Sequence, residues 1–185
     1  MNESMSLGLN ETWLINGIPG AGKTTVARLL ASRMERAAHI EGDRLQEWII
    51  SGAVWPGEQP QAESSQQVRL NIKNQCLLAQ SFGAAGFVAV LDYVIANKDS
   101  LELYRECLKE CELYFVVLAP SVDTVLRRDE NRPEKTVAAQ WIHLDTPMRT
   151  ELDGIGLWID SSHISAEATV DFILANKAIA KLQHL

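Results

Sequence analysis

The stretch Gly17-Ile18-Pro19-Gly20-Ala21-Gly22-Lys23-Thr24 decides how the rest of this sequence is interpreted. It consists of a glycine, four residues and then Gly-Lys-Thr, which is the pattern of a phosphate-binding loop. Its flanks have the required character, because 12–16 is an apolar run typical of a strand and apolar residues recur at helical spacing from 26 to 34. A glycine-rich turn with a chance lysine is the alternative, and both flanks weigh against it.

The residue types in this stretch suit a polyphosphate. Glycines let the backbone curl so that several N–H groups point inward, and the following helix N-terminus adds N–H groups and partial positive charge. Lys23 can reach the β- and γ-phosphates, and the Thr24 hydroxyl can ligate magnesium. We therefore expect ATP and Mg²⁺ as cofactors. The nucleotide would be bound by Gly17, Ile18, Pro19, Gly20, Ala21, Gly22, Lys23, Thr24 and Thr25.

Length and charge limit the class of protein. The 185 residues suffice for one α/β domain, and a net charge of −7 argues against broad electrostatic binding to nucleic acid. Cys76, Cys107 and Cys111 lack the spacing of a metal site, so we expect their thiols to pack against other side chains. Without a need for disulfides, a location in the reducing cytoplasm is expected. The sequence has no run of transmembrane length and no sign of a signal peptide, so neither a membrane partner nor secretion is expected.

Strands and helices are expected to alternate along the chain. After the loop and its helix, strands are expected at 38–41, 87–91, 113–118 and 156–159. Helices are expected at 44–50, 66–82, 100–110, from Ser121 as an N-cap, and from 165 to about 182, with a loop at 51–65. This alternation predicts a parallel, doubly wound sheet whose ligand site lies along the carboxyl ends of the strands.

Acidic residues follow two of the predicted strands. Asp43 comes just after the second strand, where a carboxylate could accept the proton of an acceptor hydroxyl or orient that hydroxyl. Capping of the next helix is the alternative. Asp92 ends the third strand and could hold Mg²⁺ directly or through water, or it could be a polar strand terminus. Glu41 is a weaker candidate for a water-bridged contact to the metal.

A dense basic cluster contains Arg128 and Arg132, which are four residues apart and would share one face of a helix. Arginine forks there could stabilise charge on a transferring phosphoryl group. We therefore assign them to the catalytic residues together with Lys23 and Asp43, and we place a lid at about 127–140. Acidic residues are interleaved with the arginines, so a solvated, ion-paired surface is the alternative.

The segment after Asp43 is expected to bind the phosphate acceptor. It covers about 44–83 of the single domain that we expect to span 1–185. Aromatic residues in it could hold an apolar or ring-bearing acceptor, and arginines could anchor a polar or anionic one. The alternative for each residue is a place in the core or on the surface. The candidate acceptor residues are Asp43, Arg44, Trp48, Trp55, Arg69 and Tyr93.

With these pieces in place, the chain resembles the small P-loop kinases of the nucleoside-monophosphate-kinase superfamily. It looks most like the chloramphenicol phosphotransferase-like and AAA_33-type small-molecule kinases. The resemblance spans about 13–179 and rests on the phosphate loop, on Gly42-Asp43-Arg44-Leu45, on Arg127-Arg128-Asp129-Glu130-Asn131-Arg132 and on Trp158-Ile159-Asp160-Ser161-Ser162. It implies a three-layer α/β fold in which a five-stranded parallel sheet of order 2-3-1-4-5 has helices on both faces and a small lid.

The same resemblance implies a role for each matching position. The phosphate loop would bind ATP, Asp43 would be the catalytic aspartate, and Arg128 and Arg132 would be the lid arginines. The stretch 158–162 would form the last strand and the loop beside the adenine. Departures concern the acceptor: Asp92-Tyr93-Val94-Ile95-Ala96 replaces the nucleotide kinases' Asp-Gly-Phe-Pro-Arg, and Glu41-Gly42-Asp43 lacks the two aspartates of shikimate-type kinases.

The expected function is that of an ATP- and magnesium-dependent phosphotransferase, acting as a monomer or homodimer. It would transfer the γ-phosphoryl group to a hydroxyl of a small molecule, either an antibiotic or a metabolite. The alternatives are a nucleotide-binding regulatory module, a nucleoside or nucleotide kinase, and a polynucleotide-end kinase. The last of these needs a basic groove, and the acidic net charge argues against it.

Overall fold

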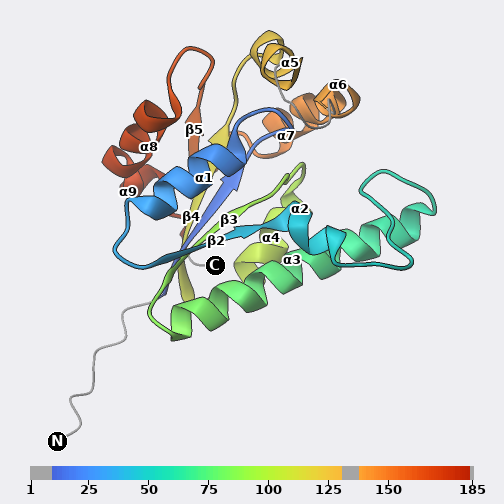
Figure 1. Cartoon of the computed structure of the whole chain (residues 1–185), viewed down its shortest axis with the longest axis horizontal. Coiled ribbons are helices and arrows are strands. Elements are labelled where there is room, and N and C mark those ends of the chain that lie inside the picture. The colour runs from blue at the N-terminus through green and yellow to red at the C-terminus, as the bar shows by residue number, and fades with distance from the viewer. Residues whose placement is uncertain (1–9, 131–137, 184–185) are drawn as a thin grey trace, which may run out of the picture.

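The protein is organised around a parallel sheet. The computed structural model describes residues 10–130 and 138–183. Its sheet has five strands in the order β2-β3-β1-β4-β5 (Figure 1), which confirms the fold class and the strand order implied by the resemblance. The strands are β1 (Asn10–Asn16), β2 (Ala37–Glu41), β3 (Val88–Asp92), β4 (Cys111–Leu118) and β5 (Leu157–Ile159).

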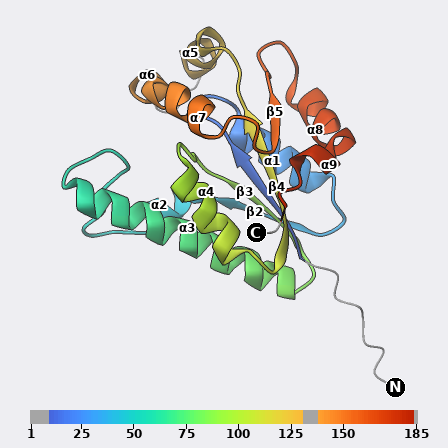
Figure 2. The same ribbon diagram turned by 180° about the vertical axis from the view of Figure 1, so that it is seen from behind.

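Helices cover both faces of this sheet. Figure 1 shows α1, α8 and α9 on one face and α3 and α4 on the other, and Figure 2 shows the same layers from behind. The short α2 follows β2, while α5, α6 and α7 gather beyond the end of β4. The helices are α1 (Lys23–Ser32), α2 (Gly42–Glu47), α3 (Gln61–Ala84), α4 (Lys98–Cys107), α5 (Val122–Glu130), α6 (Ala138–Trp141), α7 (Asp145–Glu151), α8 (Ala166–Ala175) and α9 (Lys177–Ala180), with a 3-10 turn at Ile142–Leu144.

The core is centred on β1, the middle strand. Trp13, Leu14 and Ile15 are fully buried, as expected for a parallel strand with helices over both faces. The Trp13 ring stacks on Tyr114 of β4 at a centroid distance of 4.5 Å. The central strand that leads into the phosphate loop is therefore packed on both faces.

Within the described residues, no helix combines the length and the apolar composition that a membrane span needs.

Several helix boundaries differ from the sequence-based expectation, among them α2, which ends at Glu47 rather than 50, and α4, which ends at Cys107 rather than 110. The helix predicted at 66–82 is α3, and it starts at Gln61, so the predicted loop at 51–65 ends at Pro60 instead. The last helix, predicted to run continuously, breaks at Asn176 into α8 and α9. The Asn176 side chain donates to the carbonyl of Phe172 at 2.9 Å, a local bond that competes with the helical backbone pattern. The predicted N-caps Ser121 and Ser165 are confirmed, since each hydroxyl accepts a backbone N–H three residues later.

A glycine pair before β5 gives a test of this packing. Gly156 has a φ of +71°, and a Cβ atom there would lie 2.4 Å from the carbonyl oxygen of Phe115 in β4. We expect Gly156→Ala to lower the free energy of unfolding by at least about 3 kcal/mol, because left-handed strain adds to a clash with backbone. Gly154→Ala is the matched control, with a φ of +72° but open space around it. It should cost only about 1 kcal/mol in urea unfolding. Equal losses in the two variants would contradict the packing described for β4 and β5.

Candidate functional site

The phosphate loop curls tightly between β1 and α1. Gly17, Gly20 and Gly22 have φ values of +149°, +89° and +99°, a region that favours glycine. Space is also short at Gly17, where a Cβ atom would lie 2.6 Å from the carbonyl oxygen of Leu118. A curled backbone that leads into a helix N-terminus is the arrangement that cradles phosphate groups. The loop conformation therefore fits the nucleotide phosphates that the sequence motif predicts.

Asn16 anchors the start of the loop. Its side-chain oxygen accepts the N–H of Gly17 at 2.7 Å and the N–H of Ile95 at 2.8 Å, and its amide donates to the Ile95 carbonyl at 3.0 Å. Asn16 is fully buried. Asn16 was predicted only as the end of the first strand, because its partner Ile95 lies far away in the sequence. It ties the phosphate loop to the segment that follows β3.

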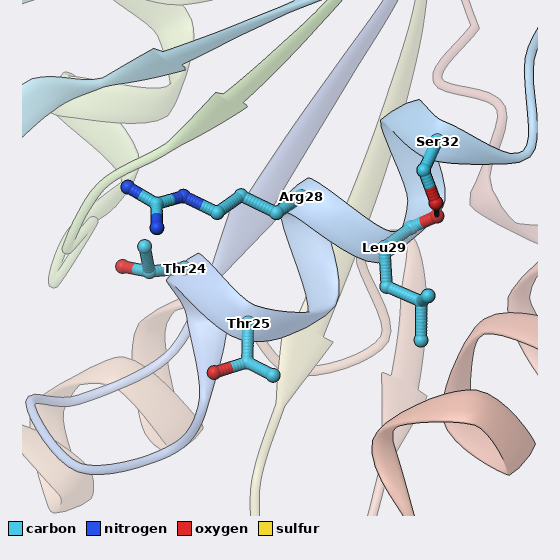
Figure 3. A pocket seen from close by; sticks show the side chains of 5 residues that line it. All are labelled: Thr24, Thr25, Arg28, Leu29 and Ser32. Atoms are coloured by element: carbon cyan, nitrogen blue, oxygen red, sulfur yellow. Dashed lines mark hydrogen bonds between the residues drawn. The ribbon is translucent and has the colours of Figure 1, made fainter.

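Lys23 folds back over the loop that it follows. Its side chain is buried, and Nζ donates to the carbonyl of Ile18 at 3.3 Å. Figure 3 shows Thr24 and Arg28 extending to one side of α1, with Thr25 and Leu29 directed elsewhere. These residues and Ser32 border a depression of about 400 Å³. All of its lining residues come from one helix, so it is an open surface hollow beside the phosphate loop rather than an enclosed site.

Charged groups meet where β2 and β3 end. Glu41 lies opposite Asp92 in the parallel register. Asp92 is buried, and its Oδ2 lies 2.9 Å from Nε2 of His39. Glu41 forms an ion pair with Arg28 of α1. His39 stands two residues before Glu41 and so on the same side of the strand, but no local pattern in the sequence marks it as part of the site. His39 orients the carboxylate that was predicted to support magnesium.

Asp43 is the second residue of α2, which begins directly after β2. Its side chain keeps access to solvent, yet crowding by the surrounding protein raises the pKa of the carboxyl group. The Lys23 ammonium lowers that pKa, and the carboxylates of Asp92, Glu47 and Glu41 raise it. Asp43 is therefore within electrostatic range of Lys23, and its catalytic role stays a prediction.

Gly42 leaves no space beside Asp43. A Cβ atom at Gly42 would lie 2.4 Å from the Tyr93 ring and 2.6 Å from the side-chain nitrogen of Gln75. Tyr93 is buried, and this burial raises the pKa of its hydroxyl, with the Asp43 charge adding to the effect. The predicted acceptor residue Tyr93 thus packs under the backbone that carries Asp43.

A second cavity, of about 350 Å³, opens on the other side of the phosphate loop. Its lining comes from three segments, and the residues are Gly20, Ala21, Gly22, Thr25, Val26, Arg128, Ser161, Ile164, Ser165, Ala166 and Thr169. The Arg128 guanidinium donates to the Ala21 carbonyl at 3.2 Å and to the Ser161 carbonyl at 2.6 Å. Partial burial and then the charge of Arg127 lower the Arg128 pKa, although a guanidinium stays protonated at neutral pH. Arg128 thus joins the phosphate loop to the loop after β5.

The remaining acceptor candidates lie in different surroundings. Arg44 pairs with Glu41 at 3.6 Å and Glu47 at 2.8 Å, and Trp48 is 69% exposed at the end of α2. Trp55 is half-buried in the loop before α3, and its backbone N–H donates to the Glu58 carboxylate at 2.8 Å. Arg69 lies on the exposed surface of α3. It is two residues, or roughly 160° around the helix, from Asn71, which contacts Gly42. Arg69 is therefore not on the side of α3 that contacts Gly42.

Part of the predicted lid cannot be placed. Arg132 and the rest of 131–137 fall outside the described residues, so the role of Arg132 stays a prediction. On the described side of this gap, the Trp141 ring of α6 lies near Gly57, where a Cβ atom would be 3.7 Å from it. In the part of the chain that the structure describes, no group of three or more His, Cys, Asp or Glu side chains could hold a metal. A magnesium ion at Thr24 and Asp92 would thus depend on the nucleotide phosphates for further ligands.

Comparison with known proteins agrees with this arrangement. An adenylyl-sulfate kinase of Vibrio vulnificus (strain YJ016) is 25% identical over 170 residues, covering 85% of this chain and 76% of that protein. A sugar kinase from Janibacter sp. superposes with a TM-score of 0.69 at 16% identity, covering 92% of this chain and 96% of that one. The Mycobacterium tuberculosis APS kinase, solved in complex with AMPPNP and APS, gives a TM-score of 0.66 at 18% identity, covering 90% and 96%.

These likenesses show that the chain has the kinase-type P-loop fold. The sequence profile of a family described as "AAA domain" matches residues 14–145, which is more than half of the chain and includes the phosphate loop and Asp43. The protein therefore belongs to the AAA domain family.

Proposed function

We propose that this protein is a kinase that transfers the γ-phosphoryl group of ATP to a hydroxyl group of a small molecule. The observation that carries the proposal is that the phosphate loop and Asp43 follow strands that end at one level of the sheet, since Ile15 pairs with Asp92 and Asp92 pairs with Glu41. A lysine there holds the transferring phosphoryl group, and a carboxylate beside it can serve the incoming nucleophile. The kinase relative and the kinase-like folds support the same class of reaction.

The cavity beside Arg128, the phosphate loop and the segment from α2 onward would each take a different part of the substrates. The cavity of about 350 Å³ beside Gly20, Arg128 and Ser161 would take the adenine and ribose of ATP. The triphosphate would lie along the phosphate loop with its γ end at Lys23. The acceptor would approach from the side of α2 and the loop 51–60, where Arg44, Trp48 and Trp55 lie. In a single domain of this kind, closure over the acceptor falls to the lid at about 127–140.

The proposed reaction is an in-line displacement. The acceptor oxygen forms a bond to the γ-phosphorus as the bond from that phosphorus to the β,γ-bridging oxygen breaks, and ADP leaves with the electron pair of that bond. Asp43 orients the acceptor hydroxyl and accepts its proton. Lys23 and, from the lid, Arg132 offset the negative charge on the transferring group, while Arg128 bonds the wall of the nucleotide cavity. Most of the acceleration would come from position and electrostatics.

Thr24 and Asp92 are the residues that would hold magnesium. The Thr24 hydroxyl follows the phosphate-binding lysine directly, and the Asp92 carboxylate keeps one oxygen beyond its contact with His39. Hydroxyl and carboxylate oxygens are the ligands that a hard cation prefers, with water and phosphate oxygens completing the shell. When bound, the ion neutralises charge on the β- and γ-phosphates.

Substitution of the two central residues tests the assignment. We expect Lys23→Ala to lower the transfer rate by about 10²–10³-fold, because charge on the phosphoryl group loses its partner. We expect Asp43→Asn to lower it by about 10²–10⁴-fold with ATP affinity retained, because the amide cannot accept a proton. ADP release across a panel of hydroxylated metabolites and antibiotics measures both. Asp153→Asn, the same acid-to-amide change at an exposed position in the turn before β5, is the control, and an active Asp43→Asn would remove Asp43 from the mechanism.

The raised pKa of Asp43 predicts a cost in stability. The folded protein binds this proton more tightly than the unfolded chain does, so stability falls as pH rises from the ordinary aspartate pKa through the raised one. Asp43→Asn should therefore raise the melting temperature at pH 7, and the gain should vanish at a pH below both pKa values. Thermal unfolding over a pH series checks this. A destabilised Asp43→Asn at pH 7 would mean that Asp43 has a net structural role.

Arg128 allows the nucleotide cavity to be tested separately. Loss of its bonds to the Ala21 and Ser161 carbonyls should loosen the cavity wall, so we expect Arg128→Ala to weaken MgATP binding by about tenfold. The neighbouring Arg127→Ala serves as the control because Arg127 is exposed and does not line the cavity. Titration with a fluorescent ATP analogue measures both. Equal affinity in the Arg128→Ala variant and the wild type would argue against nucleotide binding in this cavity.

A further inference from the structure

A row of uncharged polar side chains is buried along α3. Ser64, Gln67, Asn71 and Gln75 are each at most 6% exposed and recur every three or four residues, so they share one side of the helix. We call them the α3 polar stripe. Val68, Ile72, Cys76 and Ala79 recur at helical spacing beside the stripe, and this apolar periodicity does not reveal the polar residues. A buried polar side chain needs a partner, and here the partners are informative.

The inner end of the stripe bonds the backbone that carries Asp43. The Asn71 amide donates to the Gly42 carbonyl at 2.8 Å. The Gln75 amide donates to the Asn71 oxygen at 2.7 Å, and the Tyr104 hydroxyl of α4 donates to the Gln75 oxygen at 2.8 Å. Tyr104 and Gln75 are fully buried. A continuous chain of three hydrogen bonds thus runs from α4 through α3 to the residue before Asp43.

The outer end of the stripe bonds the loop that precedes α3. Gln67 donates to the Gly52 carbonyl and accepts the Val54 N–H, each at 2.8 Å. Ser64 donates to the Trp55 carbonyl at 2.9 Å and accepts the Gly57 N–H at 3.1 Å. Four backbone groups of this loop are therefore satisfied by two side chains of α3. The loop is held in one conformation without an apolar core of its own.

We propose that the α3 polar stripe is the positioning element of the acceptor half of the site. Its inner end sets the backbone at Gly42 and so the place of Asp43 relative to Lys23, and its outer end sets the loop 52–57. This inference rests on the proposed function, because Asn71 and Gln75 can affect the reaction rate only if Asp43 takes part in the reaction. Displacement of a catalytic group by about 1 Å can cost up to about 10²-fold in rate. By fixing the backbone before Asp43, the α3 polar stripe prevents such a displacement.

A double-mutant cycle tests the inner end. Phosphate release from MgATP, with water as the acceptor, is the assay. Asn71→Leu removes the donor to Gly42 at similar volume, and we expect turnover to fall by about tenfold with the KM for MgATP within about twofold. In an Asp43→Asn background the same change should cause no further loss, because Asn71 acts through Asp43. Asn74→Leu on the same helix is the matched control and should keep wild-type turnover.

Several outcomes separate this proposal from the proposed function. If Asp43→Asn keeps wild-type turnover, the role of Asp43 itself fails. If Asp43→Asn loses turnover but Asn71→Leu does not, only the positioning role is overturned. An equal loss from Asn71→Leu in both backgrounds would also overturn it, since a merely structural effect does not depend on Asp43. If Asn71→Leu does not fold, Tyr104→Phe removes one hydroxyl at the far end of the chain and should show the same non-additivity, with Tyr114→Phe as its control.

Amide hydrogen exchange tests the two ends without any need for turnover. We expect Gln67→Met to raise the exchange rates at 52–57 by about tenfold or more, with a smaller rise at 42–47 because the Gln46 side chain also donates to Gln67 at 2.9 Å. Asn71→Leu should raise the rates at 42–47 and spare 52–57. Gln66→Met, an exposed neighbour on α3, should leave both segments at wild-type rates. Unchanged protection at 52–57 in Gln67→Met would overturn the role of the outer end.

Discussion

The parallel register of β1, β3 and β2 decides where the phosphate loop, Asp92 and Asp43 lie relative to one another. Ile15 of β1 pairs with Asp92 of β3, and Asp92 pairs with Glu41 of β2, so the three strands end at one level. The phosphate loop begins two residues beyond Ile15, and Asp43 stands two residues beyond Glu41. Because the side chains of a strand alternate, a shift of one residue in either pairing would turn these groups to opposite faces. Packing of β1 on both faces keeps that register.

Two kinds of polar support hold the halves of the site. On the nucleotide side, Arg128 spans the carbonyls of Ala21 and Ser161 and closes a cavity beside the phosphate loop. On the acceptor side, the α3 polar stripe bonds the backbone at Gly42 and the loop before α3. Asp43 lies between these halves with a raised pKa. A carboxylate kept partly desolvated beside other acids costs stability, and such local conflict is typical of functional sites.

The sequence was informative wherever a local pattern has one structural meaning. The Gly-x4-Gly-Lys-Thr motif located the loop at 17–24, and Ser121 and Ser165 predicted helix starts through their capping chemistry. Long-range polar partners carry no such local pattern. Asn16 bonds Ile95, and Asn71 bonds Gly42 across 29 residues, so neither contact follows from periodicity. The start of α3 was missed because Gln61 to Ser65 is polar, and the apolar signal begins only at Val68.

The central claim is that the curled loop at 17–24, with Lys23, binds the phosphates of ATP. Isothermal titration calorimetry of the wild-type protein with MgATP tests it most directly. Saturable binding of one nucleotide per chain is expected. The apparent affinity for MgATP should fall when the same titration is repeated in the presence of saturating ADP, which competes for the loop. The absence of binding heat at millimolar MgATP, in protein shown to be folded, would contradict it.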